Sequence, residues 1–299
     1  MSRPNPFATK RPALQRIAGR TIRAEFAAAK LKPLSPAAVE LSRLSFPASN
    51  IECVYWRNGR RGRYRMYWSD AGTFDLDARR GRVVCHIKPG ASHNSVEEVL
   101  RGPVCSFFLV EHGFEPLHAG GVVLGGRCIA LAGAPGAGKS SLIAYLVRRG
   151  ARFFADDVLP LRLSRGALRA WPGLSQLRLV PRSVRALAWA GRELWTTRWK
   201  STLEAHPASR SQPVARVFLL DRAAQRRTVR VEPLTPREAF VALVSHTRNI
   251  AENARERMHN QLQVCGWLAN RVPVRRLVYP SGFARLEAVR RAILEDLES

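Results

Sequence analysis

The residues whose types and spacing point most directly to chemistry lie in a glycine-rich segment near the middle of the chain, residues 133–140. This segment fits the pattern G-x-x-x-x-G-K-[ST]. A β-prone apolar run, residues 128–132, precedes it, and residues 142–147 predict a helix that Gly150 would end. Such a motif needs a strand before it and a helix after it, so the segment predicts nucleotide binding.

The glycines of this loop allow the backbone to turn through positive φ, so that successive N–H groups face inward at a helix N-terminus and bind phosphate. We expect Lys139 to reach the β- and γ-phosphates and the Ser140 hydroxyl to ligate Mg²⁺. The predicted cofactor-binding residues are Gly133, Ala134, Pro135, Gly136, Ala137, Gly138, Lys139, Ser140 and Ser141.

Two adjacent acids follow the next predicted strand, residues 152–155. Asp156 and Asp157 lie 17 and 18 residues after Lys139. In a P-loop fold a carboxylate at this place faces the metal ion and the γ-phosphate. One member of a pair can then organise the metal while the other accepts a proton from the attacking hydroxyl. The alternative is a solvated turn that carries two acids.

His118 lies 21 residues before Lys139, on the strand expected to pair with the strand that enters the loop. A histidine by itself is more often a structural residue than a site residue, so both interpretations stay open from the spacing alone.

The chain of 299 residues is strongly basic, with 49 Lys and Arg against 23 Asp and Glu and a formal charge of +26. A nucleic-acid or acidic partner is one explanation of this charge. The excess is nearly all arginine and is spread along the chain. This distribution favours another explanation of the charge, a genome-wide preference for Arg and Ala codons. The charge alone therefore does not decide the partner, and nucleic acid is the less favoured one.

The five cysteines contain no C-x-x-C pair, which favours buried reduced thiols over disulfides or a zinc site. No uncharged apolar run approaches 18 residues, and no hydrophobic core follows the basic N-terminal residues, so neither a membrane span nor a secretory signal is expected. We expect a cytoplasmic protein.

The order of predicted elements indicates an α/β fold. Residues 1–48 are expected to form a basic tail, with a helix as one option for residues 16–32. Residues 49–95 predict a small antiparallel β subdomain, and residues 96–299 a P-loop domain.

Within the P-loop domain, Gly125-Gly126 predicts a hairpin turn, and capping boxes predict helices that begin near Ser95 and Thr235. A further helix is expected over residues 252–268, a strand over residues 274–279 and a last helix over residues 283–297, while residues 183–213 are expected to be irregular.

The motifs at residues 117–119, 133–141, 149–150 and 155–157 together resemble the C-terminal kinase domain of the HPr kinase/phosphorylase family. The resemblance is specific over about residues 115–160. Weaker similarity continues through residues 172–179, 214–220 and 273–278, which look like HPr kinase-related proteins found beside peptide-modification genes, including lasso-peptide tailoring kinases.

This resemblance implies a kinase that uses ATP and Mg²⁺ to phosphorylate a Ser or Thr hydroxyl of a peptide or small protein. It implies that Asp157 is the general base, that Asp156 acts near the metal with Ser140, and that His118 is hydrogen-bonded to the acidic pair. The implied catalytic residues are Asp157, Asp156, His118 and Lys139.

The sheet expected over residues 51–90 does not look like the family's usual N-terminal domain, and the P-loop domain departs from the family pattern in two places. HPr kinases usually carry Glu where this chain has Ser141, and their Leu-Glu-Ile-Arg-Gly signature is replaced near its expected place by residues 171–175. The resemblance therefore supports ATP-dependent phosphoryl transfer, and it leaves open whether phosphorolysis occurs and whether HPr itself is a substrate. Arg178 and Lys200 are candidates for phosphate or substrate contact.

Two other functions stay open from the sequence. One is a small-molecule kinase that acts on free serine or a sugar, and the other is a nucleotide-binding regulatory protein whose binding to nucleic acid would weaken steeply with salt. Whether the protein forms a homo-oligomer is also left open.

Overall fold

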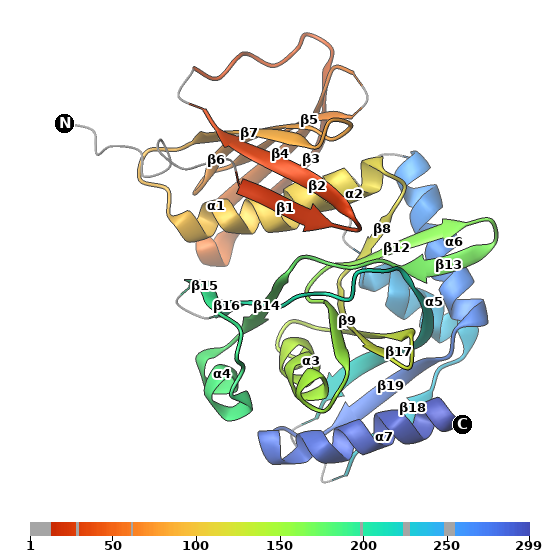
Figure 1. Ribbon diagram of the computed structural model, residues 1–299. Coiled ribbons are helices and arrows are strands. Elements are labelled where there is room, and N and C mark those ends of the chain that lie inside the picture. The colour runs from red at the N-terminus through yellow and green to blue at the C-terminus, as the bar shows by residue number, and fades with distance from the viewer. Residues whose placement is uncertain (1–12, 28–29, 61, 198–199, 224–227, 248–254) are drawn as a thin grey trace. The chain divides into compact units, whose positions relative to one another are not determined.

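The computed structural model describes residues 13–27, 30–60, 62–197, 200–223, 228–247 and 255–299 (Figure 1). The chain divides into two compact units. Unit 1 comprises Met1–Phe114 and Asn249–His259, and unit 2 comprises Glu115–Arg248 and Asn260–Ser299. No helix in the described ranges is long and apolar enough to cross a membrane.

Unit 1 contains a seven-stranded sheet with the strand order β1-β2-β7-β6-β5-β4-β3. Neighbouring strands are antiparallel except β2 and β7, which are parallel. The strands are β1 (Ala13–Ile17), β2 (Arg20–Phe26), β3 (Ala38–Phe46), β4 (Ile51–Asn58), β5 (Arg63–Trp68), β6 (Gly72–Asp77) and β7 (Arg82–Ile87), with a short helical turn η1 (Pro47–Ser49) between β3 and β4.

The expectation of a basic tail and of a helix over residues 16–32 is wrong for the described part of residues 13–46, which forms three strands of this sheet. Ala18 and Gly19 both have positive φ, 50° and 73°, and turn β1 into β2 as a two-residue hairpin. Ile22 and Ala24 of β2 are fully buried. Alternate burial of small side chains therefore overrides the helical propensity of the alanines. Residues 1–12 of the predicted tail lie outside the described residues.

One helical segment of unit 1 follows the sheet: α1 (His93–Val99), a wider turn η2 (Leu100–Val104) and α2 (Cys105–Glu111). The wider turn contains Pro103, which lacks the N–H that a regular helix would use. The ring of Phe107 lies 5.5 Å from Tyr55 and 4.9 Å from Tyr64, so α2 packs on the sheet. The predicted boundaries at residues 48/49 and 95/96 therefore do not bound this unit.

The predicted capping box at Ser95 is misplaced by three residues. Ser92 caps α1, because its hydroxyl accepts a 3.0 Å hydrogen bond from the Ser95 N–H. Ser95 itself occupies the third helical position and its hydroxyl contacts Ser92 Oγ at 2.9 Å. The sequence allows either serine to be the N-cap, and the backbone conformation decides for Ser92, which is extended, because Ser95 already lies in the helix.

Unit 2 is built on a nine-stranded mixed sheet with the order β11-β9-β10-β17-β13-β12-β8, to which β19 adds beside β17 and β18 beside β19. The pairs β10–β17 and β17–β19 are parallel and the others are antiparallel. The strands are β8 (Glu115–Leu117), β9 (Ala119–Leu124), β10 (Arg127–Gly133), β11 (Arg152–Ala155), β12 (Leu159–Ser164), β13 (Ala167–Ala170), β17 (Gln212–Arg222), β18 (Arg230–Pro233) and β19 (Val274–Tyr279).

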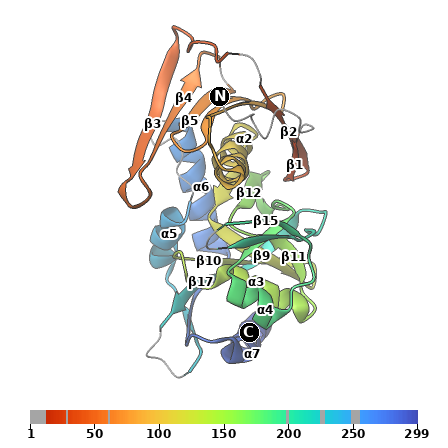
Figure 2. The ribbon, with the colours of Figure 1, turned by 90° about the vertical axis from the view of Figure 1, so that its left-hand side faces the viewer.

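Helices cover both faces of this sheet (Figures 1 and 2). Alternate residues of β10 face opposite layers: Cys128, Ala130 and Ala132 pack with α5 and α6, while Ile129 and Leu131 pack with α3 and α7. Strands buried on both faces read as continuous apolar runs, as this one does. The helices are α3 (Lys139–Arg148), α4 (Pro181–Leu187), α5 (Pro236–Ser245), α6 (Arg255–Arg271) and α7 (Leu286–Glu298), the last preceded by a turn η3 (Phe283–Arg285).

The region 183–213, expected to be irregular, is ordered over most of its described length. After α4 the chain forms β15 (Glu193–Thr196) and β16 (Ser201–Glu204), which join β14 (Gln176–Leu179) in a three-stranded sheet. The three strands are only four residues long, and β14 pairs with β16 across a long connection. No local sequence pattern therefore predicts them. Pairing buries Trp195 and Thr202.

Several local predictions are confirmed. The hairpin places Arg127 opposite Leu124, and both turn glycines have positive φ. The Thr235 cap is present: Glu238 Oε2 accepts from the Thr235 N–H at 2.9 Å. The strand predicted at residues 274–279 is β19, whereas the start of the helix predicted over residues 252–268 lies outside the described residues. All five cysteines are buried thiols.

The contact between β9 and α3 generates a prediction about stability. A Cβ at Gly120 would lie 2.1 Å from Ile143 Cδ1 and 3.2 Å from the Ala155 carbonyl oxygen, and Ile143 is fully buried. We expect Gly120→Ala to reduce the free energy of unfolding by about 1–3 kcal/mol because the packed core must shift. Chemical denaturation measures this change.

Gly266 in α6 provides the matched control. A Cβ there meets nothing within 4 Å, so Gly266→Ala should stabilise the protein by about 0.5–1 kcal/mol through helix propensity. Equal effects of the two substitutions would contradict the close approach of α3 to β9.

Candidate functional site

The glycine-rich loop joins the end of β10 to the start of α3. Gly133, Gly136 and Gly138 have φ values of 147°, 85° and 97°. A Cβ would lie 2.8 Å from the Leu220 carbonyl oxygen at Gly133, and 2.8 Å from Tyr279 Oη at Gly138. Both ends of the loop therefore require glycine for its backbone conformation and for space.

The loop leaves the first turn of α3 available to an anion. Gly138 precedes the helix in a left-handed conformation, and no side chain of the described chain caps this turn. The first N–H groups of a helix have no partner within the helix, and the helix dipole favours negative charge there. The arrangement therefore suits a phosphate group.

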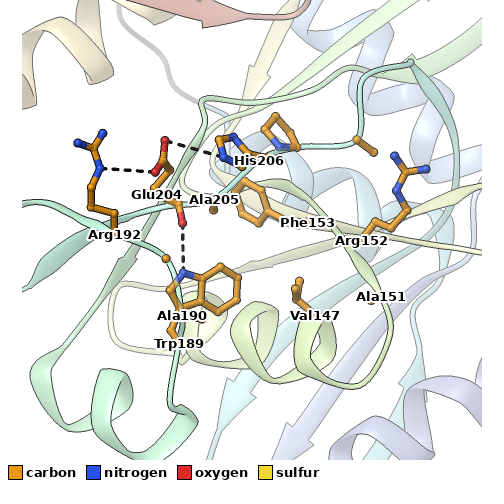
Figure 3. Close-up of a pocket in the computed structure, with 13 residues that line it drawn as sticks. Val147, Ala151, Arg152, Phe153, Trp189, Ala190, Arg192, Glu204, Ala205 and His206 are labelled. Atoms are coloured by element: carbon orange, nitrogen blue, oxygen red, sulfur yellow. Dashed lines mark hydrogen bonds and ion pairs between the residues drawn. The ribbon is translucent and has the colours of Figure 1, made fainter.

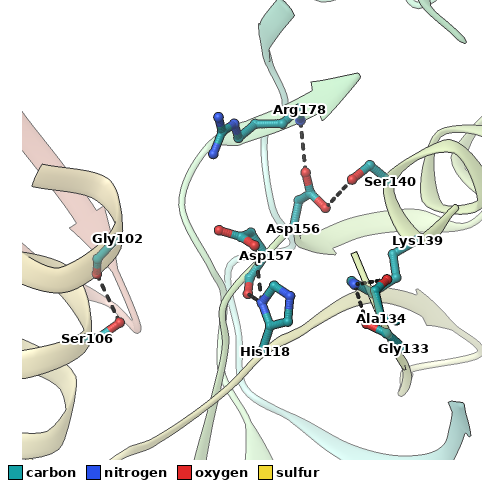
Figure 4. Close-up of polar contacts among 10 residues, drawn as sticks. All are labelled: Gly102, Ser106, His118, Gly133, Ala134, Lys139, Ser140, Asp156, Asp157 and Arg178. Carbon is teal, nitrogen blue, oxygen red and sulfur yellow. Dashed lines mark hydrogen bonds and ion pairs between the residues drawn. The ribbon is translucent and has the colours of Figure 1, made fainter. Parts of the chain in front are cut away.

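Lys139 lies inside the curve of the loop (Figure 4). Its ammonium group donates hydrogen bonds to the carbonyl oxygens of Gly133 at 2.6 Å and Ala134 at 3.3 Å. The side chain is largely buried, so its charge is held at the start of the loop.

Asp156 joins the acidic turn to the loop (Figure 4). The Ser140 hydroxyl donates to Asp156 Oδ1 at 2.9 Å, and the Arg178 backbone N–H donates to Oδ2 at 2.8 Å. The carboxyl group is thus oriented by α3 on one side and by β14 on the other.

Burial raises the pKa of Asp156, and the neighbouring Asp157 charge adds to this effect. The hydrogen bonds from Arg178 and Ser140 and the positive charge of Lys200 lower the pKa and offset part of the rise. A cation at Asp156 would compensate the buried negative charge.

Mg²⁺ fits this donor set. The ion commonly binds one or two carboxylates together with substrate phosphates and water, and it seldom has a cage made only of protein groups. No group of three or more His, Cys, Asp or Glu side chains that could hold a metal exists within the described ranges. The Ser140 hydroxyl and the Asp156 carboxyl supply the sparser pair that Mg²⁺ uses beside a nucleotide.

Asp157 has a strained backbone. Its φ is 69°, and the Val158 N–H donates to the Asp156 carbonyl oxygen at 2.9 Å, which closes a three-residue turn around it. Turns of this kind are rare, and such strain is concentrated at functional sites. The side chain is 32% exposed, so its carboxylate can meet a substrate.

His118 holds this turn. Its Nδ1 lies 3.0 Å from the Asp157 carbonyl oxygen and 3.2 Å from Asp157 Oδ1. A carbonyl oxygen can only accept, so we assign the proton to Nδ1. The His118 backbone N–H donates to the His246 carbonyl oxygen at 2.7 Å, which anchors the segment to the end of α5.

Two residues near the loop were not found from the sequence. Burial lowers the pKa of His246, with further lowering from the charges of Lys139 and His118. The Tyr279 hydroxyl donates to the Ala137 carbonyl oxygen at 2.5 Å. His246 follows α5 and Tyr279 ends β19, and no motif connects either residue to the loop.

The structure brings Ser140 of the loop and Asp156 into direct contact, and it pairs His118 with Asp157. Ser141, by contrast, directs its hydroxyl to Ser183 of α4 at 2.9 Å. The Arg178 guanidinium lies over the Trp195 ring, 5.4 Å from its centre, while its backbone N–H serves Asp156.

A cavity of about 710 Å³ lies at the other end of α3, beside Val147 and Ala151 (Figure 3). Phe153 and Trp189 line it, and Glu204 forms ion pairs at its rim. None of the predicted site residues borders it. Because the phosphate loop is at the start of α3, this cavity is not part of the candidate site.

Comparisons with known proteins find structural likeness but no matching family. No protein-family model matches the chain, and no curated protein matches its sequence. Among solved structures, the Hpr(Ser) kinase/phosphatase from Coxiella burnetii is similar over 61% of this chain and 92% of that chain, with 14% identity and a TM-score of 0.33. At these values the likeness carries no argument about activity or substrate.

The buried acid generates a prediction. Because the folded-state pKa of Asp156 is raised, its ionised form reduces stability at neutral pH, and this penalty disappears as pH falls below the ordinary Asp value. Without nucleotide or Mg²⁺, we expect Asp156→Asn to raise the melting temperature by about 2–4 °C at pH 7.5, with the difference shrinking toward pH 4.

Asp296 is the matched control, because its carboxylate lies 2.9 Å from Arg216 Nε and 2.7 Å from Arg275 Nε. Asp296→Asn removes this charge partner from two half-buried guanidinium groups and should lower the melting temperature. A lower melting temperature for Asp156→Asn at every pH would show that the two hydrogen bonds outweigh the burial of charge.

Proposed function

We propose that unit 2 binds ATP with Mg²⁺ and transfers the γ-phosphoryl group to a Ser or Thr hydroxyl of a peptide or small protein. The observation that carries this proposal is the 2.9 Å contact between Ser140 Oγ and Asp156 Oδ1. It joins the phosphate-binding loop to the acidic pair, which is the arrangement that phosphoryl transfer requires.

In this proposal the loop amides and the N-terminus of α3 bind the triphosphate. Lys139 exchanges its hydrogen bonds to the Gly133 and Ala134 carbonyl oxygens for phosphate oxygens. Ser140 and Asp156 hold Mg²⁺, which, when bound, neutralises charge on the phosphates. Burial of Asp156 strengthens its preference for a cation.

Asp157 acts on the acceptor. The hydroxyl oxygen forms a bond to the γ-phosphorus, the bond from that phosphorus to the β–γ bridging oxygen breaks, and ADP leaves. The hydroxyl proton passes to the Asp157 carboxylate. His118 orients this carboxylate through its Nδ1–H and holds the strained turn in place.

The acceptor class and the location come from sequence arguments. The motifs at residues 117–119, 133–141 and 155–157 resemble HPr kinase-related proteins, which supports a peptide or protein hydroxyl as acceptor. Five buried thiols together with a requirement for ATP support a cytoplasmic location.

The roles of Asp157 and Lys139 are separable by experiment. Asp157→Asn should lower the transfer rate by about 10²–10⁴-fold, because the proton acceptor is lost, while affinity for ATP is unchanged. Lys139→Ala should weaken ATP binding and transfer together. Transfer is measured from γ-labelled ATP to Ser-containing peptides or to the proteins that neighbouring genes encode. Affinity for ATP is measured by calorimetry.

Arg127→Ala is the control, because Arg127 is exposed at the opposite end of β10 and should leave both measurements unchanged. Full activity of Asp157→Asn would contradict the assigned base. Robust ATP hydrolysis without transfer to any peptide would contradict the acceptor class, and turnover with free serine or a sugar would identify a small-molecule kinase.

A further inference from the structure

We propose that Arg222 binds the base of the nucleotide, and that the ends of β17 and β19 form the nucleoside half of the nucleotide site. This inference rests on the nucleotide binding proposed above. It assigns a part of the site that neither the loop motif nor the acidic pair specifies.

The strand order gives the first argument. The strands β10, β17 and β19 are consecutive and parallel, with Gly133 beside Leu220 and Arg222 beside Tyr279. Their carboxyl ends therefore lie at one edge of the sheet. Ligands of open α/β sheets bind outside the carboxyl ends of the strands. Arg222 ends β17 and Tyr279 ends β19 at the edge where the loop leaves β10.

The loop is attached to this edge by Tyr279. Its hydroxyl donates to the Ala137 carbonyl oxygen, and the Ala223 N–H donates to the Tyr279 carbonyl oxygen at 3.1 Å. Burial raises the pKa of Tyr279 to about 12, so the hydroxyl keeps its proton and remains a donor at neutral pH. The end of the loop and the ends of β17 and β19 therefore form one fixed surface.

Arg222 is exposed on that surface. Its Nη1 lies 4.0 Å from the position that a Cβ on Gly138 would occupy, and its charge acts on Tyr279. Among the described residues its guanidinium takes part in no hydrogen bond or ion pair that fixes it elsewhere. A guanidinium held beside the last glycine of the loop can meet a ligand that the loop binds.

The direction of the triphosphate decides which part of the ligand Arg222 meets. Asp156 follows β11, and β11 and β17 lie on opposite sides of β10 in the sheet order β11-β9-β10-β17. The γ-phosphate end belongs on the β11 side, so the nucleoside extends toward Arg222.

A planar guanidinium stacks on an aromatic base, whereas an ammonium group does not. Arg222→Lys therefore keeps the positive charge and removes the stacking surface. We expect Arg222→Lys and Arg222→Ala each to weaken ATP binding about fivefold, equivalent to about 1 kcal/mol. Binding of inorganic tripolyphosphate to Arg222→Lys should stay within about twofold of wild type, because the phosphate contacts and the charge are retained.

Calorimetric binding of ATP and of tripolyphosphate to the full chain tests the role of Arg222. Arg127→Lys is the matched control, and the melting temperature of each variant shows whether it is folded. Unchanged ATP affinity in both Arg222 variants overturns the proposal. Equal loss of ATP and tripolyphosphate in Arg222→Lys also overturns it, because Arg222 would then contact phosphate. If wild type binds neither ligand, the proposed nucleotide function itself fails.

Discussion

The candidate site depends on a carboxylate kept out of water beside the start of a helix. Asp156 is buried, and its charge is compensated only in part by the Ser140 hydroxyl, the Arg178 N–H and the charge of Lys200. Ionisation at such a place is unfavourable unless a cation arrives. The same burial that reduces stability in the empty protein would favour the metal–nucleotide complex that we propose for this site.

The sheet of unit 2 places that carboxylate by its topology. The hairpin of β9 and β10 puts β11 on one side of the loop strand, and the parallel pairing puts β17 and β19 on the other. In the proposed nucleotide complex, the acids on one side and Arg222 and Tyr279 on the other would face opposite ends of a ligand that lies along the loop. The two helical layers bury both faces of β10, so a one-residue slip would exchange the small residues that face α5 and α6 with the larger residues that face α3 and α7.

Local sequence patterns were sufficient to predict the elements that are stabilised by local interactions. The hairpin glycines, the Thr235 cap and the strand over residues 274–279 follow from backbone preferences and side-chain periodicity, and the structure has them. The basic tail was the main error, because the Ala-rich residues 16–32 carry no strong strand signal and only sheet pairing makes them β1 and β2. The β14–β16 sheet escaped prediction for the same reason.

The sequence by itself determined the glycine-rich loop with Lys139 and Ser140, because the motif is a local pattern of residue types. It also gave Asp156, Asp157 and His118 as candidates from their places beside the strands expected around the loop. Only the tertiary structure decided that Ser140 meets Asp156, that His118 holds Asp157, and that Tyr279 and Arg222 lie beside Gly138. The Ser140–Asp156 contact joins residues 16 positions apart and the Tyr279–Ala137 hydrogen bond joins residues 142 positions apart. Such contacts are set by strand order and packing, which no local pattern contains.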